Sequence, residues 1–432
     1  MIRLLCAIGV AAALGVPMAA QELLASHQRG QAKRMLSTIK SAIKEHYYDP
    51  AYRGIDIEAH FKAAEAKLDE ARSLSHAYGI IAQALIDFDD SHTFFVPPMD
   101  ATSVEYGWEI RMIGDACYVT AVRPGSDAEA KGLTAGDRVL RVEQYVPMRQ
   151  DLWKLRYLLY MLSRRSMVRM VVQAPGAPAP RTLEIVARVT KHPKVVDVDI
   201  DRLGQAILND SREARTAQNR FGRAGTVGIW KLSGFAFNPS DVDRMMDEAT
   251  EDATALVIDM RGNGGGLIKT LEEVAGRLFD RDVRIGDIKT RKSSKPLVAE
   301  TRRSPFTGRL AVLIDSDSAS AAEILARLVQ IEKRGTVIGD RSAGAVMQGE
   351  IRGGALEGAG GLMFYFASVT NAELLMSDGA SLEKRGVVPD ELLLPTGADL
   401  AAGRDPVLAR AVALLGGSLD PAAAGAMFPV EW

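Results

Sequence analysis

The sequence predicts a mixed α/β protein built from more than one domain. From about residue 226 onward, apolar strand-like runs alternate with segments of helical spacing, which is typical of a partly parallel sheet covered by helices. Residues 104–190 instead combine short strands with turns, and residues 30–90 show only helical spacing. The chain has 432 residues, of which 47% are hydrophobic and 25% charged, so it is long enough for two or three domains with a sizeable core.

The first twenty residues have the features of a secretory signal. Arg3 is followed by the apolar run Leu4–Val16, and small residues precede Gln21. The alternative is a retained membrane anchor, but the run is too short to span a bilayer comfortably, so cleavage after Ala20 is preferred. We therefore expect an exported protein, periplasmic or secreted, with no stable membrane span after cleavage.

Charge and cysteine content exclude several other classes. The formal net charge of -2 gives no electrostatic case for nucleic-acid binding. After signal cleavage Cys117 alone remains, so no intramolecular disulfide can form. No group of His, Cys and Asp has the spacing of a metal site, and we expect neither a metal nor a cofactor. The oligomeric state is left open.

The chain divides into five segments by composition and pattern. These are a signal peptide (1–20), a helical region (21–103), a small β-rich domain (104–190), an α/β core (191–415) and a tail rich in Ala, Gly and Pro (416–432).

The β-rich segment resembles a PDZ domain. The turn GLTAGD at 132–137 precedes the strand VLRV, and the order of strands and helices fits that fold. A PDZ groove binds a peptide C-terminus as an added strand, with backbone N–H groups holding the carboxylate. The alternative is a generic β-barrel insert without a ligand. The loop and groove strand would comprise Tyr106, Gly107, Trp108, Glu109 and Ile110.

Ser320 lies where a buried strand turns into a helix. The run 310–314 is apolar, and helical spacing begins after Ser320. A serine at a helix N-terminus has free backbone N–H groups and the positive end of the helix dipole beside it, which can stabilise an oxyanion. The alternative is that Ser318 and Ser320 only cap the helix, with Glu323 completing a capping box.

The stretch DMRGNGGG, residues 259–266, also follows a strand directly. Three consecutive glycines allow a sharp turn and expose backbone N–H groups. Such a loop can bind phosphate or form half of an oxyanion hole. It lacks the GK[ST] ending of a nucleotide-binding loop, so nucleotide binding is disfavoured. The alternative is a flexible turn.

Taken together, DMRGNGGG, SDSASAAEI, GDRSAGAVMQ and the closing PDELLLP resemble, in order and spacing, the carboxyl-terminal processing (tail-specific) proteases. The resemblance covers nearly all of the mature chain. It implies a ClpP/crotonase-like α/β peptidase core with an inserted PDZ-like domain and an N-terminal helical segment. It also implies a serine endopeptidase that acts on peptides or proteins without a cofactor.

The resemblance makes Ser320 the nucleophile, but this chain departs from the family at the general base. Where the lysine-dependent branch has its base, the chain has Ala345. The tricorn-type branch takes its base from a Ser-His pair, which Ser91 and His92 match. That branch also uses a glutamate near its end, which Glu383 matches better than Glu373.

By this resemblance, Ser91 and Glu383 would orient and polarise His92, the general base. An oxyanion hole would combine Gly264 or Gly265 with the amide of Ala321. Two other functions remain open. A peptidase relative without activity would bind peptides or proteins through the PDZ-like groove, and a third possibility is a binding module for small apolar ligands.

Overall fold

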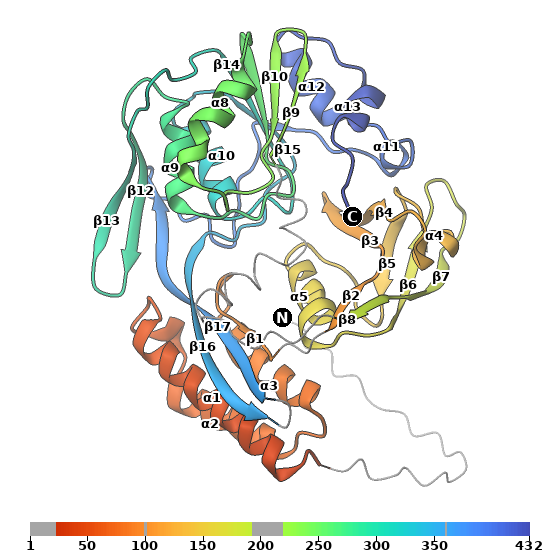
Figure 1. Ribbon diagram of the computed structural model, residues 1–432, viewed down its shortest axis with the longest axis vertical. Helices are drawn as coiled ribbons and strands as arrows, with labels where there is room; N and C mark the ends of the chain where they lie inside the picture. Colours follow the sequence, from red (N-terminus) through yellow and green to blue (C-terminus); the bar gives the residue numbers. More distant parts are fainter. Residues whose placement is uncertain (1–22, 99–101, 192–218, 359–360) are drawn as a thin grey trace, which may run out of the picture.

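A computed structural model describes residues 23–98, 102–191, 219–358 and 361–432, and shows an α/β core, a small β domain and a helical layer (Figure 1). The predicted signal peptide, residues 1–20, lies outside these described ranges. Within them, no helix is both long and apolar enough to cross a membrane. The mixed α/β class expected from the sequence is confirmed by the three sheets of five or six strands and the helices packed on them.

The N-terminal part is a layer of three helices. Asp56 and Ser73 accept backbone hydrogen bonds at the starts of the second and third helices, as expected of N-cap residues. The apolar faces pack together and onto the long hairpin described below. The elements are α1 (Ser26–His46), η1 (Tyr52–Gly54), α2 (Ile57–Asp69) and α3 (Leu74–Ile86).

The small β domain contains a five-stranded antiparallel sheet in the order β3-β4-β5-β6-β7, and the helix α5 packs against it. A separate pair, β2 and β8, lies where the chain enters and leaves the domain. The elements are β2 (Thr102–Glu105), β3 (Trp108–Ile113), β4 (Ala116–Val122), α4 (Asp127–Ala130), β5 (Arg138–Val142), α5 (Leu152–Tyr157), η2 (Leu158–Leu162), β6 (Met167–Gln173), β7 (Arg181–Val186) and β8 (Arg188–Lys191).

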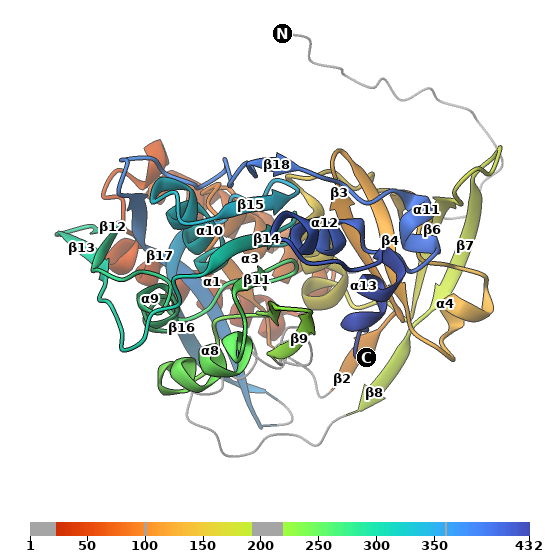
Figure 2. The same ribbon diagram turned by 90° about the horizontal axis from the view of Figure 1, so that it is seen from above.

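The core sheet has six strands in the order β18-β15-β14-β11-β10-β9, parallel except for β9. One face is covered by α8, α9 and α10, and the other by α12 and α13 (Figure 2). Because β11 and β14 are parallel neighbours, the segments that follow them meet at one edge of the sheet. The elements are β9 (Arg220–Ala224), β10 (Val227–Lys231), η3 (Pro239–Asp241), α8 (Val242–Thr250), β11 (Ala255–Asp259), α9 (Ile268–Gly276), β14 (Arg309–Ile314), α10 (Ala321–Ile331), β15 (Thr336–Gly339), β18 (Glu391–Leu392), α11 (Gly397–Ala401), α12 (Pro406–Leu414) and α13 (Pro421–Met427).

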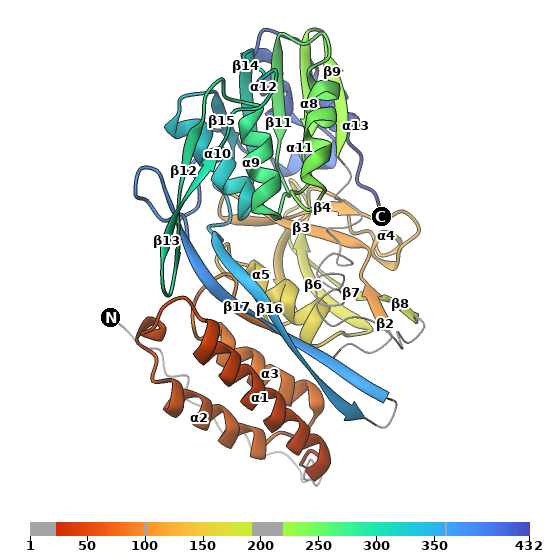
Figure 3. The ribbon, with the colours of Figure 1, turned by 60° about the vertical axis from the view of Figure 1, so that its left-hand side comes forward.

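A long antiparallel hairpin, β16 (Met347–Gly358) and β17 (Gly361–Met376), joins the three parts. It runs from the core across the helical layer, where α1 and α3 lie along it (Figure 3). β17 also pairs with β1 (Phe94–Val96) and β12 (Val283–Thr290), and β12 pairs with β13 (Ser294–Ala299). This hairpin, which was not predicted from the sequence, brings the segment before β1 to the core.

Candidate active site

Ser320 occupies a strained turn between β14 and α10. Its backbone angles are φ 53° and ψ -119°, in the positive-φ region that residues with a Cβ seldom adopt. Such strain costs on the order of 1–3 kcal/mol and persists where the surroundings enforce it. Here the Ser320 amide donates to the carbonyl of Ala345 at 3.0 Å. The turn therefore presents the Ser320 side chain at the start of a helix.

Ser318 has a different role. It is fully buried, and its hydroxyl donates to the carbonyl of Met260 at 2.8 Å while accepting from the amide of Asp315 at 2.9 Å. These contacts tie the turn after β14 to the end of β11. Ser318 is therefore an internal structural hydroxyl, whereas Ser320 is partly exposed.

Glu323 does more than cap a helix. Its buried carboxylate accepts four hydrogen bonds, from the amides of Ser320 (3.1 Å), Gly344 (2.7 Å) and Ala345 (2.9 Å) and from the hydroxyl of Ser342 (2.6 Å). Burial raises the pKa of Glu323 to about 7. The carboxylate thus joins the serine turn to the loop that contains Ala345. The sequence indicated only its capping-box position and not these loop contacts.

Ser91, His92 and Glu383 form one hydrogen-bonded chain. Ser91 Oγ lies 2.8 Å from His92 Nδ1 and donates to Glu383 Oε2 at 2.9 Å. The Ser91 amide donates to the other carboxylate oxygen at 2.8 Å. Burial raises the pKa of Glu383, although these hydrogen bonds favour its ionised form. Glu373, the alternative carboxylate, lies instead on β17 opposite Lys289.

This arrangement selects one tautomer of His92. Because the Ser91 hydroxyl gives its proton to Glu383, its oxygen accepts from Nδ1–H of His92. The other ring nitrogen, Nε2, is then unprotonated and able to accept a proton. Desolvation lowers the pKa of His92 to about 4, so the ring is neutral near pH 7. A neutral imidazole with a free Nε2 is what a general base requires.

The backbone of residues 345 and 346 connects the two halves of the site. Ala345 accepts from the Ser320 amide, and the amide of Val346 donates to Glu383 at 2.8 Å. Among the contacts of the described residues, no hydrogen bond joins Ser320 directly to His92. Catalytic hydrogen bonds are often long before substrate binds, so this geometry is compatible with a serine and its base.

The glycine run packs against Ser320. A Cβ on Gly265 would lie 2.6 Å from the Ser320 Cβ and 3.1 Å from the Ala321 nitrogen, so only glycine fits there. The Gly265 amide already donates to the side chain of Asn263 at 2.8 Å. Gly264 is exposed beside it. Gly264 is therefore the better candidate of the two for an oxyanion donor, together with Ala321.

The residues expected to form a PDZ-like groove are mostly internal. The side chains of Tyr106, Trp108 and Ile110 are buried in the small domain. Along the outer edge of β3, the Ile110 carbonyl accepts from Arg156 at 2.6 Å and the Met112 carbonyl accepts from Ser316 at 2.7 Å. The strand edge that would receive a peptide is thus already hydrogen-bonded at these two carbonyls.

The same contacts attach the small domain to the serine turn. Asp317 forms ion pairs with Arg111 (3.0 Å) and Arg156 (2.9 Å), and Arg111 also reaches Asp315 at 2.8 Å. Desolvation opposes the charge of Asp317, but Arg156 and Arg111 outweigh it and hold the pKa of this carboxyl well below its usual range. Strand β3 and helix α5 of the small domain are therefore linked to the segment immediately before Ser320.

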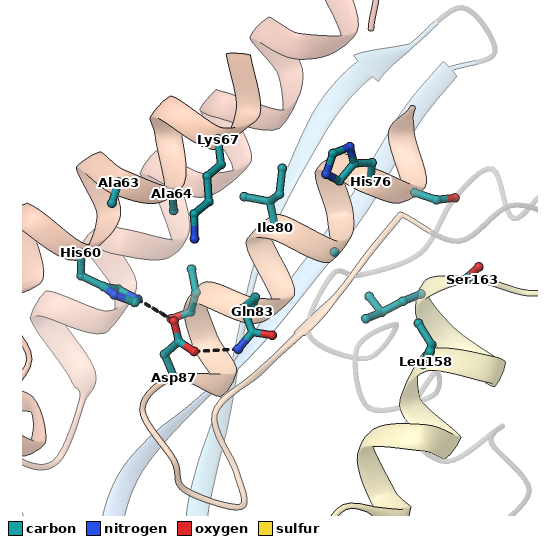
Figure 4. A pocket seen from close by; sticks show the side chains of 14 residues that line it. His60, Ala63, Ala64, Lys67, His76, Ile80, Gln83, Asp87, Leu158 and Ser163 are labelled. Carbon is teal, nitrogen blue, oxygen red and sulfur yellow. Dashed lines mark hydrogen bonds and ion pairs between the residues drawn. The ribbon is translucent and has the colours of Figure 1, made fainter. Parts of the chain in front are cut away.

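A separate hollow of about 460 Å³ lies between α2, α3 and η2. Figure 4 shows His60 and Gln83 directed towards Asp87 at one side of this hollow. Its lining includes neither Ser320 nor His92, so it is distinct from the candidate active site. In the parts of the chain that the structure describes, no group of three or more His, Cys, Asp or Glu side chains could hold a metal ion.

Known proteins resemble this chain over most of its length. Residues 226–393 match the model of peptidase family S41. This part of the chain therefore resembles the S41 peptidases. The chain is 27% identical over 377 residues to the chloroplastic C-terminal processing peptidase of Tetradesmus obliquus, covering 82% of this chain and 75% of that relative. It is 23% identical over 341 residues to a carboxyl-terminal-processing protease of Picosynechococcus, covering 74% of each.

Solved structures show the same fold. The mature CPAF structure aligns with a TM-score of 0.65 at 16% identity, covering 87% of this chain and 95% of that one. The photosystem II D1 C-terminal processing protease aligns with a TM-score of 0.51 at 22% identity, over 84% of this chain and 93% of the other. The resemblance to carboxyl-terminal processing proteases is thereby confirmed, and the chain is an enzyme of the serine peptidase class.

Proposed function

We propose that this S41 peptidase cleaves peptide bonds with Ser320 as nucleophile and His92 as general base. Ser320 Oγ attacks the scissile carbonyl as its proton passes to His92 Nε2. His92 then protonates the leaving amine, and water hydrolyses the acyl-enzyme by the same steps in reverse. The amides of Gly264 and Ala321 would hold the oxyanion. The observation that carries the proposal is the hydrogen-bonded chain Glu383–Ser91–His92.

Ser91 and Glu383 act through His92. The Ser91 oxygen holds Nδ1–H, which keeps Nε2 free, and the carboxylate stabilises the imidazolium that forms when Ser320 loses its proton. Ala345 cannot replace this base, because its side chain is a methyl group. The serine–histidine pair therefore supplies the proton transfer that a lysine would otherwise perform.

We further propose that the substrates are exported peptides or proteins whose C-termini reach the PDZ-like domain. The N-terminal pattern of Arg3 and a short apolar run supports export. Backbone groups of residues 106–110 would bind the substrate C-terminus. Since Arg156 holds the Ile110 carbonyl, pairing at that position requires this contact to open.

Hydrolysis of casein by the mature protein tests the peptidase proposal. We expect Ser320→Ala to reduce cleavage to the uncatalysed background and Glu383→Gln to reduce it on the order of 10²-fold, since the charge opposite the imidazolium is lost. Glu373→Gln is the matched control, because this carboxylate lies on β17 away from Ser91. A folded wild type that binds C-terminal peptides without cleaving any protein would instead indicate a binding module.

A further inference from the structure

A buried carboxylate with no role so far lies beneath the Ser91–His92 turn. Asp90 is 2% exposed. Its Oδ1 accepts from the backbone amides of His92 at 3.0 Å and Thr93 at 2.7 Å. Fixing these two consecutive amides fixes the direction in which the His92 side chain leaves the backbone.

Three hydroxyl groups, two of them from distant parts of the chain, also bind Asp90. Tyr47, just after α1, donates to Oδ2 at 2.8 Å. Thr370 on β17 donates to Oδ1 at 2.6 Å, and the Thr93 hydroxyl lies 3.0 Å from Oδ2. The carboxylate is therefore the point where the helical layer, the long hairpin and the His92 turn meet.

We propose that Asp90 is a positioning residue for His92, holding the general base at a fixed place between the helical layer and the hairpin. The proposal rests on the proposed function of His92. A carboxylate suits this task because its two oxygens accept all five hydrogen bonds, whereas an amide offers only one oxygen. A small displacement of a catalytic group has large kinetic effects, on the order of 10²-fold for 1 Å.

The charge of Asp90 also acts on the ring. Burial lowers the pKa of His92, and the negative charge of Asp90 opposes that effect. The other charged and titratable groups near His92 are unchanged in an Asp90 variant. Glu383 faces the ring through Ser91, and Asp89 pairs with Lys384 at 2.7 Å. Arg53 and the phenol of Tyr47 lie towards Asp90 from the side of the helical layer.

The first test compares Asp90→Asn with wild type by the rate of fluorophosphonate labelling across pH. Loss of the charge weakens the base, so we expect labelling near pH 8 to be about 10- to 100-fold slower. The acid limb of the profile should move to lower pH, because the pKa of His92 falls.

Asp137→Asn is the control. Asp137 is a fully buried aspartate of the small domain that accepts from the Thr134 amide at 3.0 Å. The Asp137→Asn variant should be less stable than wild type, and the acid limb of its pH profile should not shift. An Asp90→Asn profile identical to wild type would overturn the proposal.

A second readout does not depend on activity. In protein with ¹⁵N-labelled histidine, near pH 7.5, His92 should show a protonated Nδ1 in wild type and a mixture of tautomers in Asp90→Asn. If His92→Ala is labelled as fast as wild type, the proposed function is wrong, and the tautomer spectrum still decides whether Asp90 holds the ring. An unchanged spectrum would refute the proposal that Asp90 positions His92.

Should Asp90→Asn not fold, Tyr47→Phe removes one of the five hydrogen bonds and should slow labelling severalfold.

Discussion

The backbone amide of Ser320 donates a hydrogen bond to the carbonyl of Ala345, 3.0 Å away. The resemblance to the lysine-dependent proteases would put their general base at this position, where this chain has no amine. Ala345 supports the serine turn through its carbonyl and cannot accept a proton. In the proposed mechanism the proton acceptor therefore comes from another segment, the Ser91–His92 turn.

A methyl group at residue 265 should disable the serine. In Gly265→Ala the new Cβ would lie 2.6 Å from the Ser320 Cβ and 3.0 Å from the Ala319 carbonyl, at a backbone φ of +99°. We expect casein hydrolysis to fall on the order of 10²-fold or more, because Ser320 and the Ala321 amide must shift. Gly379→Ala is the control, since it also has positive φ but meets no atom within 4 Å. Equal losses in both variants would contradict the argument.

Glu323 should make stability depend on pH. Its pKa is about 7 in the folded protein, against 4.5 for the free side chain. Between these values the folded state binds more protons than the unfolded state, so the free energy of unfolding falls as pH rises through this window. The contribution is fully present below about pH 4.5.

Urea unfolding at about pH 5 and pH 8 measures this effect. We expect Glu323→Gln to be less stable than wild type at both pH values, because the amide cannot accept four hydrogen bonds. The fall in stability between the two pH values should be smaller in the variant, since the titrating group is gone. An identical fall in both proteins would show that Glu323 does not titrate in this range.

Releasing the edge of β3 should favour peptide binding. Arg156→Gln removes the hydrogen bond to the Ile110 carbonyl and one ion pair of Asp317. We expect a peptide with a free apolar C-terminus to bind several-fold more tightly to Arg156→Gln than to wild type, measured by fluorescence anisotropy. The same peptide with an amidated C-terminus is the control. If affinity does not change, residues 106–110 are not the binding edge.

Most of the fold could be predicted from the sequence, because its signals are local. Apolar strands followed by helical spacing predicted the parallel part of the core, and the strand VLRV expected after the turn at 132–137 is present in β5. The hairpin of β16 and β17 was missed. Its stretch Gly353-Gly354 is weak in strand-forming residues, and its pairing depends on contacts with the distant helical layer.

The site was predicted less completely, for a physical reason. Ser320, His92 and Glu383 stand out as reactive residue types in recognisable motifs. The buried carboxylates Asp90 and Glu323 do not, since their importance comes from hydrogen bonds to segments far away in sequence, such as Thr370. That the Gly265 amide is already bound to Asn263 could be learned only from the three-dimensional arrangement.

The most direct measurement is the rate at which a fluorophosphonate probe labels the mature protein, compared among wild type, Ser320→Ala and His92→Ala. The account predicts labelling of wild type, none in Ser320→Ala, and labelling slower on the order of 10²- to 10⁴-fold in His92→Ala, the range that general base catalysis contributes. Folded wild-type protein that takes up no probe, or His92→Ala that reacts as fast as wild type, would contradict the claim that His92 activates Ser320.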